Sequence, residues 1–259
     1  MSIVAAAVLP HSPVLLSSIA KEHSSLFTVT QESMRNVLSE GIAAQPDVVL
    51  VLTPHGTSEA GDIILHTAEH FRGVFDEFGD MTTMLTMRGA VGISHQLHSA
   101  AEAAHVHLPQ QTFSALDYGT SIPLTQLPNS VTAPLLCVVQ CLTQEPETIL
   151  RCADVLREFT IRHRQRFFVI ASADCTRRRD RHPDARRRPT TEERTYSSAI
   201  TAVDAPQLSG FRPDPTTCGY GPILMLLAML QGHAAEGHVR TFEAPLGVGL
   251  LTADFTLRS

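Results

Sequence analysis

Four short runs, each dominated by apolar residues, recur along the chain. They are Ile3–Leu9, Asp47–Thr53, Pro134–Gln140 and Phe167–Ala173. A strand that is buried on both faces of a sheet has such a continuous apolar run, whereas a half-exposed strand alternates apolar and polar residues. We therefore predict that these four runs are the central strands of one sheet.

The segments between these runs place apolar residues at the three- and four-residue spacing of a helix with one buried face. Four segments have this spacing: Thr30–Ala44, Ile93–His105, Glu145–Arg164 and Pro222–Gln231. Pro222 suits the first turn of its helix, where the missing N–H has no partner to lose. The alternation predicts an α/β fold, with residues 1–259 as a single domain and a mainly parallel central sheet flanked by helices on both faces.

The remaining segments have weaker patterns. Edge or terminal strands are expected at Asp62–Thr67, Val239–Glu243 and Gly249–Leu257. The arginine-rich stretch from Cys175 to Arg194 contains two prolines and lacks apolar periodicity, so it is predicted to be a loop over the sheet, with a possible role as a lid.

Charge and cysteine content restrict the class of protein. The formal net charge of -6 provides no general attraction to phosphate backbones or anionic lipids, so neither a nucleic-acid nor a membrane partner is expected. The run Ile3–Leu9 is too short for a signal-peptide core or a transmembrane helix. The 5 cysteines are odd in number and show no paired CxxC spacing, which argues against a disulfide framework and favours a reducing cytoplasm.

Two of the 13 histidines directly follow predicted strands. His11 lies in a Pro-His-Ser-Pro turn after the first strand, and His55 lies in a Pro-His-Gly turn after the second. Ligands bind at the carboxyl edge of open α/β sheets, so the two turns can bring two imidazoles together, and Gly56 permits close approach by a ligand. Either they share a metal ion, or each histidine hydrogen-bonds its own loop.

Three other positions are candidates for chemistry at the same edge. Cys218 precedes a predicted helix, where a thiol loses its proton more easily and can bind metal; the alternative is a small residue buried in a tight turn. Asp117 and Tyr118 lie in a glycine-containing turn, and Asp174 follows a central strand. Either aspartate could instead cap a helix or turn. Cys137, Cys141 and Cys152 are interpreted as buried structural residues.

Several of these segments together resemble the LigB-type class III extradiol dioxygenase superfamily, including its Memo-like branch. The segments are LPHSP, VVLVLTPHG, LDYGTSIPL, IASAD and CGYGPI, in the order of the family and over most of the chain. The resemblance implies a single α/β domain with its active site at the sheet edge, often assembled into dimers or larger homo-oligomers.

The resemblance also implies a set of metal ligands. Ring-cleaving members hold non-haem Fe(II) with two histidines and a glutamate, and here the histidines would be His11 and His55. The third ligand would be Cys218, as in the Memo-like branch, with Glu243 in reserve. Asp174 matches that branch's aspartate near the metal. A thiolate is softer than a carboxylate and also suits Zn or Cu.

Two departures from the family pattern concern acid/base catalysis. Tyr118 stands where the dioxygenases usually have a histidine, and Cys175 follows the strand-end aspartate where they carry another. Tyr118 could donate a proton in its place, and His182 in the arginine-rich loop could approach the site. Arg177 and Arg178 could bind a substrate carboxylate, although most of these arginines are expected to be solvated.

Two hypotheses follow. The first is an Fe(II)-dependent extradiol-type dioxygenase that cleaves a catechol-like ring with O₂, using Asp174, Tyr118 and His182 beside the metal. The second is a Memo-like metal-binding protein with a redox or partner-binding role and no ring cleavage. Metal-assisted hydrolysis is disfavoured because the sequence has no HExxH or similar spacing.

Overall fold

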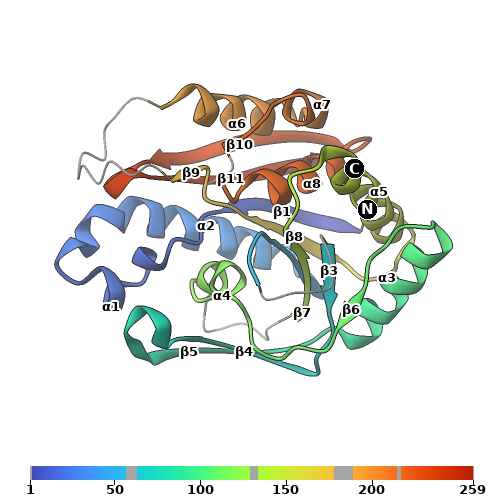
Figure 1. The fold of residues 1–259 in the computed structure, drawn as a ribbon, viewed down its shortest axis with the longest axis horizontal. Helices are drawn as coiled ribbons and strands as arrows, with labels where there is room; N and C mark the ends of the chain where they lie inside the picture. Colours follow the sequence, from blue (N-terminus) through green and yellow to red (C-terminus); the bar gives the residue numbers. More distant parts are fainter. Residues whose placement is uncertain (1, 57–62, 129–133, 178–188, 215–216, 259) are drawn as a thin grey trace.

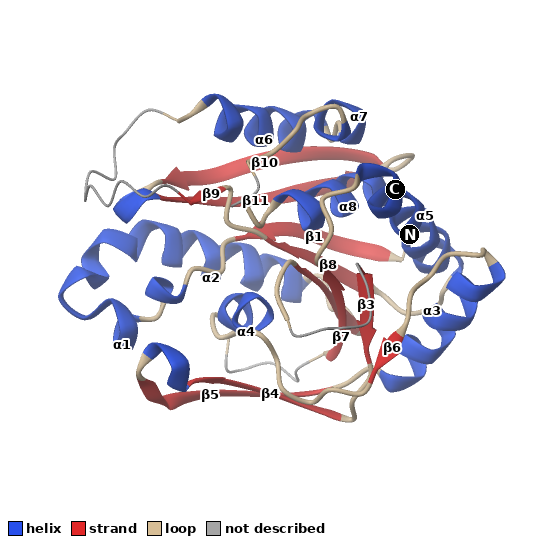
Figure 2. Cartoon of the chain, viewed as in Figure 1, coloured by secondary structure: helices blue, strands red, loops and turns tan. Residues whose placement is uncertain are grey.

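The four predicted central strands lie side by side in a single twisted sheet (Figures 1 and 2). The computed structural model describes residues 2–56, 63–128, 134–177, 189–214 and 217–258. The strands of the sheet are β1 (Ile3–Leu9), β2 (Val48–Thr53), β3 (Ile63–His66), β6 (Gln110–Gln111), β7 (Leu135–Cys141), β8 (Phe167–Ser172), β9 (Thr176–Arg177), β10 (Ala234–Glu243) and β11 (Val248–Arg258). Their order is β10-β11-β1-β8-β2-β7-β3-β6, and β9 pairs with β11 outside this path.

The centre of the sheet is parallel and its outer strands are mixed. β1 pairs with β8, β8 with β2, and β2 with β7, all in parallel. β11 pairs with β1 in antiparallel fashion, and so does β3 with β7. The predicted mainly parallel sheet is therefore confirmed, and the three weaker segments do form strands outside its centre.

Helices cover both faces of the sheet, as predicted (Figure 2). The helices are α1 (Ser17–Ala20), α2 (Thr28–Ala43), α3 (Val91–Ala103), α4 (Tyr118–Leu124), α5 (Pro146–Arg162), α6 (Thr191–Ala202), α7 (Ala205–Ser209) and α8 (Tyr220–Leu230). Short 3-10 helices occupy Pro13–Leu15, Lys21–Phe27, Asp76–Phe78 and Pro245–Gly247. Within the described residues, no helix combines the length and apolarity needed to cross a membrane.

The two faces of the sheet contribute to two separate hydrophobic cores. Leu50 and Leu52 pack in the core that contains α3, α5 and α8, whereas Val49 and Val51 pack in the core that contains α2 and α4. Successive side chains of a strand point to opposite faces, so a strand covered on both sides must be apolar at every position. This burial explains the continuous apolar runs in the sequence.

Some structure was not predicted. β4 (His70–Phe75) and β5 (Asp80–Arg88) form a separate two-stranded sheet. The predicted loop from Cys175 to Arg194 is wrong at both ends, because β9 begins at Thr176 and α6 begins at Thr191. The start of α6 is set by a capping box, in which Thr190 and Glu193 each bind the other's backbone N–H. Residues 178–188, including Arg178 and His182, lie outside the described residues.

The contact between α6 and β10 provides a test of the fold. A Cβ atom at Gly237 of β10 would lie 2.0 Å from the backbone oxygen of Ile200 in α6. We therefore expect Gly237→Ala to lower the free energy of unfolding by about 1–3 kcal/mol, because the helix must move away from the strand. Urea denaturation would measure the change.

Gly92→Ala is the matched control. A Cβ atom at Gly92 in α3 meets nothing within 4 Å. Alanine is preferred over glycine in a helix by about 0.5–1 kcal/mol, so this variant is expected to be as stable as the wild type or slightly more so. Equal stability losses in the two variants would contradict the proposed packing of α6 on β10.

Candidate metal centre

The site is built where three neighbouring parallel strands end. His11, His55 and Asp174 each lie two residues beyond the last residue of β1, β2 and β8, respectively. β8 lies between β1 and β2, with Leu9 of β1 paired to Ser172 and Leu52 of β2 paired to Ala171. The three segments that follow these strands therefore leave the sheet at nearly the same level and on the same edge.

The two Pro-His turns bring their imidazoles together. Nε2 of His11 lies 3.1 Å from Nε2 of His55. Sγ of Cys218 lies 3.3 Å from the same Nε2 of His11. The three candidate ligand atoms all lie within 4.8 Å of one another, and in the described part of the chain they are the one cluster of at least three such side chains suited to a metal.

The spacing of these atoms fits a small metal ion. In a tetrahedral site with metal–nitrogen distances of about 2.0–2.1 Å and metal–sulfur distances of about 2.3 Å, two nitrogens are about 3.3 Å apart and a nitrogen and a sulfur about 3.6 Å apart. The observed 3.1 and 3.3 Å are close to these values. Two imidazoles and a thiol therefore suit a divalent transition metal after a small outward adjustment.

Cys218 reaches His11 because its loop is held from two sides. The Thr217 hydroxyl donates to Oε1 of Glu192 in α6 at 3.0 Å, and Nε2 of Gln144 donates to the Thr217 carbonyl at 2.9 Å. Gly219 donates its N–H to the Asp174 carbonyl, and a Cβ atom at Gly219 would lie 2.7 Å from that oxygen. Glu192 and Gln144 were not predicted, since no local pattern relates them to the loop.

The other cysteines are poorly suited to bind metal. All four are buried, whereas Cys218 is partly exposed. Burial raises the pKa of Cys137 to about 11 and that of Cys152 to about 12, and it raises the pKa of Cys175 well above its usual value. A thiol must lose its proton to bind a metal, so these three stay neutral structural groups.

Glu243, the reserve third ligand, is placed elsewhere. Its carboxylate accepts hydrogen bonds from the backbone N–H and the hydroxyl of Thr30 in α2, at 3.2 and 2.6 Å. The cluster of candidate ligands contains Cys218 and not Glu243. The carboxylate instead connects the end of β10 to the first turn of α2.

Tyr118 begins α4 and faces the histidines. Its hydroxyl lies 2.9 Å from Nε2 of His55, and the two ring centres are 4.4 Å apart. The segment was predicted as a turn, but Asp117 caps a short helix by accepting the backbone N–H of Thr120. The capping alternative for Asp117 is thus confirmed.

Asp117 also binds the strand below it. Its carboxylate accepts hydrogen bonds from the hydroxyls of Thr53 in β2 and Thr120 in α4, at 2.9 and 2.8 Å. Burial raises the pKa of Asp117, and the hydrogen bonds from Thr120 and Thr53 partly oppose this rise. A Cβ atom at Gly119 would lie 2.7 Å from the Thr53 hydroxyl, so glycine allows α4 to approach β2 closely.

Asp174 and Gly56 support the two histidine turns. Asp174 is 2% exposed; its Oδ1 accepts the backbone N–H of His11 at 3.0 Å, and its Oδ2 lies 3.9 Å from Nε2 of His11. Gly56 has φ +142°, and a Cβ atom there would lie 1.9 Å from Oε1 of Gln140. Close approach by a ligand was expected at Gly56, but the group that approaches its backbone closely is the Gln140 side chain.

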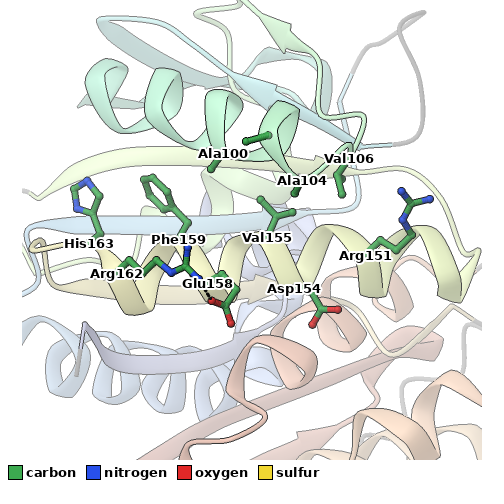
Figure 3. Close-up of a pocket in the computed structure, with 11 residues that line it drawn as sticks. Ala100, Ala104, Val106, Arg151, Asp154, Val155, Glu158, Phe159, Arg162 and His163 are labelled. Atoms are coloured by element: carbon green, nitrogen blue, oxygen red, sulfur yellow. Dashed lines mark hydrogen bonds and ion pairs between the residues drawn. The ribbon is translucent and has the colours of Figure 1, made fainter.

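A separate groove lies away from this site. It has a volume of about 680 Å³ and is lined by residues of α3 and α5 and the ends that follow them (Figure 3). Ala100, Val155 and Phe159 provide apolar surface, and the charged residues include Glu158 and Arg162, which form an ion pair at 2.9 Å. None of its lining residues comes from the strand ends that carry the histidines.

Comparison with known proteins identifies a family and a fold. The family model described as the catalytic LigB subunit of aromatic ring-opening dioxygenase matches residues 5–190. Protein CA_C1420 of Clostridium acetobutylicum is 19% identical over 265 residues, covering 93% of this chain and 55% of that protein, so the chain spans about half the length of this relative. The crystal structure of the uncharacterized protein JW3007 from Escherichia coli K12 has the same fold, with a TM-score of 0.62, 12% identity, and coverage of 97% of this chain and 99% of that one.

The contacts of Asp117 generate a stability prediction. This carboxylate accepts hydrogen bonds from the Thr53 hydroxyl and from the backbone N–H and hydroxyl of Thr120, so Asp117→Ala would leave the buried Thr53 hydroxyl and Thr120 N–H without this acceptor. We expect the free energy of unfolding to fall by about 1–3 kcal/mol, the cost of leaving a buried polar group unpaired. Urea denaturation would measure it.

Asp204→Ala serves as the control for capping alone. Asp204 caps α7 by accepting the N–H of Gln207 at 2.8 Å. Loss of a helix cap typically costs about 1 kcal/mol, so the smaller loss of stability is expected for this variant. If Asp117→Ala cost no more than Asp204→Ala, the contacts of Asp117 with the Thr53 and Thr120 hydroxyls would not contribute to stability.

Proposed function

Because the chain belongs to the LigB family, catalytic subunits of aromatic ring-opening dioxygenases, we propose that it is a metal-dependent dioxygenase of the extradiol type. Its substrate would be a small catechol-like molecule, cleaved beside its hydroxyls with O₂. The observation that carries the proposal is the convergence of His11, His55 and Cys218, whose ligand atoms lie within 4.8 Å of one another. They lie at the edge of the sheet where α/β proteins bind ligands.

We assign the metal to these three side chains. Fe(II) is the first choice because of the family, and Zn or Cu are the alternatives because of the thiolate. Fe(II) held by these three side chains would supply open coordination positions for a catecholate and O₂. His11 is 1% exposed, so the protein encloses one ligand almost completely while His55 and Cys218 remain partly accessible.

Two side chains beside the ligands are assigned to proton transfer and positioning. The Tyr118 hydroxyl, 2.9 Å from Nε2 of His55, is proposed to exchange a proton with a hydroxyl of the bound catechol. Asp174 holds the His11 backbone through its Oδ1 and directs negative charge towards the ligands. His182 stays a sequence-based candidate for acid/base catalysis, outside the described residues.

A second function is favoured by one observation, the thiol at the third position. Thiolates prefer Zn and Cu(I), whereas iron dioxygenases of the two-histidine type use a carboxylate. The alternative is therefore a Memo-like protein that binds metal through the same three residues and has a redox or partner-binding role without ring cleavage. Metal content and oxygen consumption distinguish the two functions.

Oxygen uptake tests the first function directly. After anaerobic reconstitution with Fe(II), the protein is expected to consume O₂ and form coloured ring-fission products with at least one member of a catechol panel. Tyr118→Phe is expected to keep the metal and to lower kcat by about 10²–10⁴-fold, the usual contribution of a general acid or base. An oxygen electrode and absorbance spectra would measure both.

Tyr196→Phe is the matched control. The Tyr196 hydroxyl is buried in α6 and has no hydrogen-bond partner among the described residues, so its loss should leave turnover unchanged. Tight binding of Zn or Cu with no iron-dependent oxygen uptake on any catechol would overturn the dioxygenase proposal and support the Memo-like alternative.

The identity of the third ligand can be tested without turnover. Co(II) bound through a thiolate has a near-ultraviolet sulfur-to-metal charge-transfer band, so the Co(II)-loaded wild type should show this band. Cys218→Ser should lose it and bind Co(II) more weakly. Glu243→Gln should keep both the band and the affinity, because the Glu243 carboxylate binds Thr30 instead.

Opposite results would reassign the site. If Glu243→Gln releases Co(II) while Cys218→Ser retains it, the carboxylate is the third ligand and Cys218 is a structural residue. His11→Ala and His55→Ala complete the series, and each should reduce the bound metal. Unchanged metal content in both would contradict the shared site.

A further inference from the structure

Ser172, the last residue of β8, joins two parts of the site through one hydroxyl group. The side chain is fully buried, and its Oγ donates to the backbone oxygen of Gly119 at 2.5 Å. The same Oγ lies 2.9 Å from Nδ1 of His11. A carbonyl oxygen can only accept, so the single hydroxyl proton of Ser172 points to Gly119.

This direction determines which nitrogen of His11 carries the proton. Because the Ser172 proton is already used, Nδ1 of His11 must donate its own hydrogen to Ser172 Oγ. A neutral imidazole has one N–H, so Nε2 then has a lone pair. Nε2 is the atom that lies 3.1 Å from His55 and 3.3 Å from Cys218.

We propose that Ser172 is a positioning residue that holds His11 in the Nδ1–H tautomer and thereby presents Nε2 to a metal shared with His55 and Cys218. The tautomer follows from the hydrogen bonds alone, whereas its consequence for metal binding rests on the proposed function. Partners that bind the second nitrogen of a ligating histidine orient the ring and raise metal affinity.

Pro123 explains why the Gly119 carbonyl is available to Ser172. In an α-helix this carbonyl would accept the N–H of the residue four positions later, which here is Pro123 of α4. Proline has no N–H, and its ring pushes the carbonyl four residues before it away from the helix axis. The proline thus leaves the Gly119 carbonyl in the first turn of α4 without this N–H donor, and the Ser172 hydroxyl donates to it instead.

The same contact relates His11 to Tyr118. Gly119 directly follows Tyr118, whose hydroxyl lies 2.9 Å from Nε2 of His55. The Ser172 hydroxyl therefore fixes two groups at once: the imidazole of His11, and the α4 segment that carries Tyr118. Loss of the hydroxyl is expected to loosen both.

Histidine NMR and metal titration test this role in the intact 259-residue chain. In metal-free protein at about pH 8, above the ordinary histidine pKa of about 6.5, two-bond ¹H–¹⁵N spectra should show His11 protonated at Nδ1; comparison with His11→Gln assigns the signals. In Ser172→Ala the Nδ1–H population should fall, and the Zn(II) affinity measured by chelator competition should fall about 10–100-fold. Pro123→Ala supplies an N–H that competes with Ser172 for the Gly119 carbonyl. This variant should also lower the Nδ1–H population and the Zn(II) affinity, but less than Ser172→Ala does.

Ser121→Ala is the matched control. Ser121 is also fully buried and lies in α4, but its hydroxyl has no partner among the described residues, so neither the tautomer nor the affinity should change. A wild type with His11 protonated at Nε2, or a folded Ser172→Ala whose tautomer and Zn(II) affinity stay within twofold, would overturn the proposal. A wild type that shows Nδ1–H but binds no metal would support the role of Ser172 in setting the tautomer and overturn the metal centre itself.

Discussion

The parallel, in-register pairing of β1, β8 and β2 is the constraint on which the site depends. Because Leu9 pairs with Ser172 and Leu52 with Ala171, the segments after the three strands leave the sheet at nearly the same level. Each then places a polar side chain two residues later, at His11, Asp174 and His55. A shift of one residue in any strand would exchange its buried faces, so the same packing that stabilises the sheet also sets the positions of these groups.

β8 has a central role because it lies between the two histidine-bearing strands. Ser172 at its end and Asp174 in the turn after it both support His11, through the Ser172 hydroxyl on the ring and the Asp174 carboxylate on the backbone N–H. Buried polar groups need such partners, and His11 is 1% exposed. The network therefore satisfies the imidazole and also selects one orientation of it, which a candidate metal ligand requires.

The regular elements were predictable where burial imposes a pattern. All four central strands are predicted within about one residue at each end, because strands covered on both faces are apolar throughout. The hairpin of β4 and β5 was missed because β4 alternates exposed and buried residues over one short segment, and β5 is largely exposed and rich in threonine and methionine. α4 was missed because Gly119 and Pro123 are unusual in a helix, and α6 because its best signal is the short Thr190–Glu193 capping box.

The sequence alone determined which residues follow the buried strands, since apolar runs and Pro-His turns are local patterns. It therefore indicated His11, His55 and Asp174 as neighbours at one edge. Only the tertiary structure decided that Cys218, 207 residues after His11, reaches the same point while Glu243 binds Thr30. The position of Cys218 depends on the contacts of Thr217 with Glu192 and Gln144, which no local pattern encodes. The contacts of Ser172 with Gly119 and His11 likewise join residues that are far apart in the sequence.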